Sequence, residues 1–84
     1  MFATTTITSA RRRLGVRVRS SREKRGLTQQ SLADVIGIDR TYLSGIENGR
    51  RNVSFENLVR LARGLDIPLS ELVDGVDVEC DGKS

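Results

Sequence analysis

The sequence predicts an all-α fold, a compact domain of five short helices. Three residues suited to helix N-caps, Thr28, Asp39 and Ser54, each precede apolar residues at helical spacing. Gly37 stands where the first of these helices must stop, because glycine takes the left-handed conformation without a Cβ clash. With 37% hydrophobic but only 4% aromatic residues, an 84-residue chain can build one mainly aliphatic core.

The first helix is expected over Arg12–Lys24, where Leu14 and Val18 give a thin apolar stripe. Basic residues collect at its C-terminal end, where the helix dipole favours them. The preceding segment shows no helical or strand pattern, so residues 1–11 are predicted to form a flexible basic arm.

The second and third helices are expected within Thr28–Gly49, joined by the turn at Gly37. In the second helix, apolar residues recur on one face, at Leu32, Ala33 and Ile36. In the third, which Asp39 can cap, the inner residues are Leu43 and Ile46. Its outer side is polar or small, with Arg40, Thr41, Ser44 and Gly45. Such a helix is not built to be buried on both sides, and it suits insertion into the major groove of DNA.

The fourth and fifth helices complete the core. Ser54 can cap the fourth helix, whose expected core stripe consists of Phe55, Leu58, Leu61, Ala62 and Leu65. Pro68 breaks that helix and can begin the fifth, over Leu69–Val73. Residues 76–84 are predicted to form an acidic tail, and the lone Cys80 there excludes an internal disulfide.

The spacing within the two central helices resembles the helix-turn-helix of the Cro/phage-repressor (XRE) family of transcription regulators. The matching positions are Gln29, Ala33, Gly37, Leu43 and Ile46, followed by Glu47-Asn48-Gly49. The resemblance implies a lambda-repressor-like DNA-binding domain over residues 12–75. The run IDRTYLSGIENGRRNVSFENL further resembles the controller proteins of restriction–modification systems, a branch of the same superfamily.

The resemblance also implies structural roles for four residues. Ala33 matches the small position where the two helices touch, and Gly37 matches the turn. An arginine at the position of Arg22 commonly forms a buried ion pair with the glutamate at the position of Glu47, which fixes how the first and third helices pack.

DNA contacts are expected from nine residues: Arg17, Gln29, Arg40, Thr41, Tyr42, Ser44, Arg50, Arg51 and Asn52. Arg40 can donate bidentately to guanine, and Thr41 and Ser44 lie on the same side of the helix. The resemblance implies a phosphate contact for Gln29, and Arg17 is expected to be exposed to phosphates.

Other positions leave alternatives open. The Tyr42 ring can pack against the fourth helix while its hydroxyl meets a phosphate. Gly45 fits either close approach to DNA or close packing between helices. Arg11-Arg12-Arg13 fits either a solvated charge run or an arm that contacts phosphates. The loop of Gly49 to Asn52 is expected to clamp phosphate through its arginines and backbone amides.

Charge and composition set the class of partner. Residues 11–25 carry a net charge of +7, residues 26–63 of +1 and residues 64–84 of −5, so the N-terminal part is expected to face a polyanion. No histidine, glycine-rich phosphate loop or 18-residue apolar run is present. We therefore expect no enzyme activity, metal, cofactor, small-molecule ligand or membrane partner, and a reducing, cytoplasmic location.

The expected partners are double-stranded DNA and a second copy of the chain. The apolar residues at the C-terminal end exceed what a short helix needs to dock, and in the resembled family this end often forms the dimer interface. Here these residues are Leu69, Leu72, Val73 and Val76. The alternative is a protein-interaction module, such as an antitoxin or a regulatory subunit, that uses the same fold.

Overall fold

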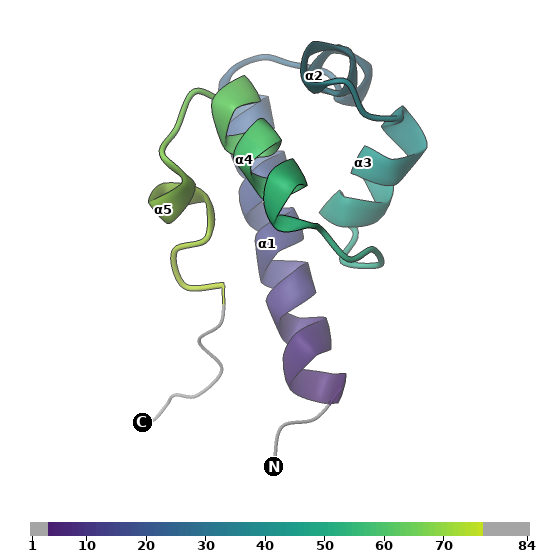
Figure 1. The fold of residues 1–84 in the computed structure, drawn as a ribbon, viewed down its shortest axis with the longest axis vertical. Helices are drawn as coiled ribbons and strands as arrows, with labels where there is room; N and C mark the ends of the chain where they lie inside the picture. The colour runs from purple at the N-terminus through teal and green to yellow at the C-terminus, as the bar shows by residue number, and fades with distance from the viewer. Residues whose placement is uncertain (1–3, 77–84) are drawn as a thin grey trace.

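Five helices in the predicted order make up the computed structural model, which describes residues 4–76 (Figure 1). The helices are α1 (Thr4–Lys24), α2 (Gln29–Ile36), α3 (Arg40–Glu47), α4 (Phe55–Gly64) and α5 (Leu69–Leu72). The expected acidic tail and Cys80 lie outside the described residues, apart from Val76. No helix among residues 4–76 combines the length and the apolar character that crossing a membrane requires.

Local chemistry at the helix ends is as predicted. The side chains of Thr28, Asp39 and Ser54 accept hydrogen bonds from the first-turn backbone N–H groups of α2, α3 and α4. Each bond satisfies a donor that has no partner within its own helix. At the end of α2, Gly37 adopts the left-handed conformation with φ of 76°, and its N–H donates to the carbonyl of Ala33.

The core lies between α1, α4 and the α2–α3 pair, and α5 closes it from the other side. Ten apolar side chains are buried in it: Leu14, Val18, Leu32, Ala33, Leu43, Ile46, Leu61, Ala62, Leu65 and Leu72. All ten except Ala33 and Ala62 are branched aliphatic residues, in agreement with the aliphatic core expected from the composition. In Figure 1, α2 and α3 lie on one side of α1 and α4, and α5 lies on the opposite side.

Two sequence-based expectations about the fold are wrong. The first helix begins at Thr4 rather than Arg12, so the residues from Thr4 to Arg11 are helical. In this extension, Ile7 and Ala10 line a groove together with Val53 and Val76. Phe55, expected in the core stripe, is 71% exposed, because the first residue of α4 projects beyond the residues that cover its other turns.

Candidate nucleic-acid interface

The α2–α3 pair forms the centre of the candidate interface. The turn at Gly37 lets α3 begin at Arg40, with only three residues between it and the end of α2. On the inner side of α3, Leu43 and Ile46 are buried. On its outer side, Arg40 and Thr41 are exposed and Ser44 is half-buried. The structure therefore separates a packed inner face from a polar outer face on this one short helix.

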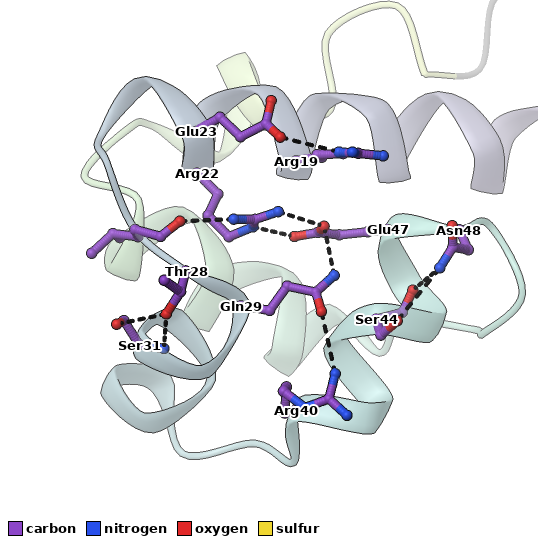
Figure 2. Close-up of polar contacts among 11 residues, drawn as sticks. Arg19, Arg22, Glu23, Thr28, Gln29, Ser31, Arg40, Ser44, Glu47 and Asn48 are labelled. Atoms are coloured by element: carbon purple, nitrogen blue, oxygen red, sulfur yellow. Dashed lines mark hydrogen bonds and ion pairs between the residues drawn. The ribbon is translucent and has the colours of Figure 1, made fainter.

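A buried ion pair between α1 and α3 fixes the orientation of α3 (Figure 2). The Nε and Nη2 atoms of Arg22 donate to the two carboxylate oxygens of Glu47 over 2.7 Å and 3.1 Å. Their side chains are only 11% and 2% exposed, and Arg22 also donates through Nη1 to the carbonyl oxygen of Leu27. The hydrogen bond with Glu47 raises the pKa of Arg22 above its ordinary value, although burial acts in the opposite direction. Arg22 therefore stays charged throughout the physiological pH range, and the pair implied by the family resemblance is present.

The same network extends to the outer face of α3 through Gln29. Its side-chain amide donates to Glu47 over 3.0 Å, and its side-chain oxygen accepts a 3.4 Å hydrogen bond from Arg40 (Figure 2). Gln29 thus bridges the buried ion pair and the arginine that is expected to read a base. In this arrangement both ends of the Gln29 side chain have partners within the chain, so any contact of Gln29 with phosphate stays a prediction.

The loop that follows α3 closes over the end of this helix. The Tyr42 hydroxyl donates to the carbonyl of Asn52 over 2.8 Å and accepts from the side chain of Asn57 over 3.3 Å. A phosphate can only accept, and the single hydroxyl proton of Tyr42 is already used. Donation from this hydroxyl to a phosphate would require release of its bond to Asn52, so the phosphate contact stays a prediction, while the expected packing of the ring is present.

Gly45 makes room for the side chain of Arg51. A Cβ atom added at Gly45 would lie 2.4 Å from the Cγ of Arg51, and the guanidinium of Arg51 sits 5.2 Å from the centre of the Tyr42 ring. Such cation–π contact holds a cation at a defined place. The expected close packing between helices is absent here, because the immediate neighbour of Gly45 is a loop side chain, and close approach to DNA stays a prediction.

Gly15 is a structural residue that the sequence analysis did not identify. A Cβ at this position would lie 2.4 Å from the backbone oxygen of Glu47 and 2.6 Å from that of Ile46. The backbones of α1 and α3 therefore touch here, one and two turns before Val18 and Arg22 make their own contacts. A glycine inside a predicted helix was the available signal, because its cost in helix stability calls for a packing reason.

Arg17 lies away from the candidate interface. It is half-buried, and its guanidinium donates to the carbonyl oxygen of Glu71 in α5, on the opposite side of α1 from α3 (Figure 1). The expectation that Arg17 is exposed is therefore wrong, and its contact with phosphate stays a prediction that this position does not favour. The arginines of α1 lie on more than one face of the helix, which a count of charges along the sequence cannot show.

The residues expected at the dimer interface differ in their exposure. Leu72 is completely buried in the core of its own chain, so it is not available to a partner, and its assignment to a dimer surface is wrong. Leu69, Val73 and Val76 are half-buried and remain partly accessible. Of the four expected residues, these three remain candidates for contact with a second copy.

Comparisons with known proteins agree with this geometry. The profile of the helix-turn-helix family matches residues 18–72. Control protein C.MunI from a Mycoplasma species is 52% identical over 58 residues, which span 69% of this chain and 78% of that protein. The crystal structure of the restriction-modification controller protein C.AhdI from Aeromonas hydrophila has a TM-score of 0.73 at 45% identity, covering 74% of this chain and 94% of that one.

A further solved structure shows a related protein on DNA. The restriction-modification controller protein C.Esp1396I, crystallised as a tetramer in complex with its natural 35 base-pair operator, has a TM-score of 0.72 to this chain at 28% identity. The match covers 80% of this chain and 88% of that one.

Proposed function

Because this chain belongs to the helix-turn-helix (XRE) family of DNA-binding transcription regulators, we propose that it binds a specific operator as a homodimer, with α3 in the major groove. The family regulates transcription without catalysis, in line with the expectation that the chain is not an enzyme. Its similarity to controller proteins of restriction–modification systems supports a role in controlling such a system.

The outer face of α3 is the observation that supports sequence-specific binding most directly. Arg40 and Thr41 are exposed at the start of the helix, and the major groove is wide enough for a helix to enter. Hydrogen bonds among Gln29, Glu47 and Arg22 connect α3 to α1 and α2 and hold its orientation. A helix that is held rigidly presents its polar side chains to base edges without a further ordering cost.

Cations beside α3 supply the contacts that do not depend on sequence. Arg50, Arg51 and Asn52 are exposed in the loop that follows α3. Arginine–phosphate contacts give a protein–DNA complex much of its affinity and its salt dependence. This division assigns base reading to α3 and backbone contact to the loop.

Homodimer formation is supported by the partly exposed Leu69, Val73 and Val76 at the end of the fold opposite α3 (Figure 1). Two α3 helices related by a twofold axis would enter successive major grooves and read half-sites about 10 base pairs apart. The operator-bound tetramer of C.Esp1396I supports operator binding by an oligomer. The alternative, a protein-interaction module, does not account for the polar, cation-flanked outer face of α3.

The test starts with selection of bound sequences from a random DNA pool, followed by affinity measurements on the selected operator. We expect Arg40→Ala to cost about 1–3 kcal/mol of binding free energy and to relax preference at one base pair in each half-site. Thr28→Ser, which keeps the cap hydroxyl of α2, serves as a control and should leave base preference unchanged. Equal weakening of Arg40→Ala on all sequences would contradict a base-reading role for this residue.

A further inference from the structure

The N-terminal part of α1 lies outside the family match. The match begins at residue 18, whereas α1 begins at Thr4 and extends past the ends of α3 and α4 (Figure 1). This part of α1, Thr4–Arg17, contains four arginines and no acidic residue. Its charge therefore has the same sign as the loop after α3.

Backbone contact joins this part of α1 to that loop. Gly49 approaches α1 so closely that a Cβ added to it would lie 3.0 Å from the Cα atom and 3.2 Å from the backbone nitrogen of Arg12. Gly49 also has φ of 73°, a conformation that glycine adopts without strain. The loop therefore rests on α1 at Arg12, and the two segments share one surface.

A side-chain contact adds to this junction. Arg11 donates through Nη2 to the side-chain oxygen of Asn52. Arginine has only donors, so this bond identifies the oxygen of the amide group and leaves the NH2 group of Asn52 to point elsewhere. An NH2 group held in this way can donate to an acceptor such as a phosphate oxygen.

We propose that the turn of α1 that carries Arg11 and Arg12 is an additional DNA-backbone contact, continuous with the loop of Gly49 to Asn52. Arg12, which is exposed, binds a phosphate beside those that the loop contacts. Arg11 is a positioning residue, which holds the amide of Asn52 with its donor outward. The proposal rests on the proposed function, since it extends the same interface toward the flanking DNA.

Because the loop and the turn of α1 both carry positive charge, a polyanion is the partner that suits this surface. Arg12, Arg50 and Arg51 are exposed, and Arg11 is half-buried. A second protein at this place would need acidic groups to meet these cations, whereas a DNA backbone presents them at regular spacing. A single continuous surface lets one strand contact the loop and α1 together.

The test compares the double variant Arg11→Ala/Arg12→Ala with Arg60→Ala/Arg63→Ala. Both lose two positive charges, but Arg60 and Arg63 lie on α4 beside Val35 and Ile36, away from the loop after α3. Affinity for the selected operator is measured against salt concentration, and hydroxyl-radical footprints are recorded. We expect the α1 variant to reduce the salt slope by about one to two units and to lose protection at flanking phosphates. Its order of preference among operator sequences should stay that of the wild type.

The α4 variant should keep the wild-type slope and footprint. Equal slopes and footprints for both variants would overturn the proposal, as would a change of oligomeric state confined to the α1 variant. If the double variant unfolds, Arg12→Gln alone tests the phosphate contact, because Arg12 is exposed and its loss leaves the Asn52 contact in place. Absence of any sequence preference in the wild type would contradict the proposed function instead, and the slope comparison could still be made on any duplex.

Discussion

The long helix α1 holds its two neighbours, α3 and α5, by different means. Against α3 it makes backbone contact at Gly15 and a bidentate, buried ion pair between Arg22 and Glu47. Against α5 it makes a side-chain hydrogen bond, from Arg17 to the carbonyl oxygen of Glu71. α3 has eight residues and α5 only four.

This difference matches the proposed tasks of the two helices. A helix that reads bases has to keep its orientation to within a fraction of an ångström, and touching backbones with a charged, bidentate bond allow little adjustment. A helix at a dimer interface can tolerate small shifts, because apolar contacts are not directional. We therefore expect changes at the α1–α3 contact to cost more stability than changes at the α1–α5 hydrogen bond.

The largest effect is expected for Glu47→Ala. It leaves the guanidinium of Arg22 buried without its carboxylate, which costs about 3–5 kcal/mol of unfolding free energy. Denaturant unfolding measures this loss. Glu23→Ala, which removes the exposed carboxylate partner of Arg19, is the matched control and should cost at most about 1 kcal/mol. Similar losses for both variants would show that the buried pair does not hold α3 more firmly than a surface pair.

An intermediate effect is expected for Gly15→Ala. The new Cβ meets the carbonyl oxygens of Ile46 and Glu47, so α1 and α3 have to separate at a cost of about 1–3 kcal/mol. Thermal unfolding measures the stability, and operator affinity reports the displacement of α3. The neighbouring change Val16→Ala, at a side chain that is 64% exposed, should lie within about 0.5 kcal/mol of the wild type. Higher stability of Gly15→Ala would mean that helix propensity outweighs the close contact.

The smallest effect is expected for Arg17→Ala. It removes one hydrogen bond to α5, worth about 0.5–1.5 kcal/mol, and also removes a buried Nε that makes no hydrogen bond within residues 4–76. Removal of this unbonded Nε favours the folded state, so the net loss of unfolding free energy should be smaller than the value of the hydrogen bond. Sedimentation should show weaker self-association at unchanged salt dependence of DNA binding. A reduced salt slope would restore Arg17 to the DNA interface and remove the contrast between the two faces of α1.

Local signals in the sequence were sufficient for the helix-turn-helix. Thr28, Gly37 and Asp39 set the ends of α2 and α3 through their own backbone and side-chain chemistry, which depends on residues no more than four positions away. The inner residues Leu43 and Ile46 followed from helical spacing. The pairing of distant residues, Arg22 with Glu47, came from the family resemblance rather than from local pattern.

Contacts between distant segments account for the expectations that were wrong. The segment Thr4–Arg11 shows no helical pattern of its own, and its residues Ile7 and Ala10 line a groove with Val53 and Val76, which lie far along the chain. The place of Arg17 depends on α5, which lies 54 residues further along the chain at the hydrogen-bonded Glu71. Helical spacing alone also cannot show which residues at the end of a helix are covered by other segments, and Phe55 is an exposed example. The remaining DNA contacts and dimer residues stay predictions.

The position of Tyr42 has a practical consequence for spectroscopy. The chain contains one tyrosine and no tryptophan, so its ultraviolet-excited emission above 300 nm comes from this side chain alone. That ring lies beneath Arg51, and its hydroxyl is bonded to the loop at Asn52. The protein therefore carries an intrinsic fluorophore at the junction of α3 and the loop, where it can report on ligand titrations without an attached dye.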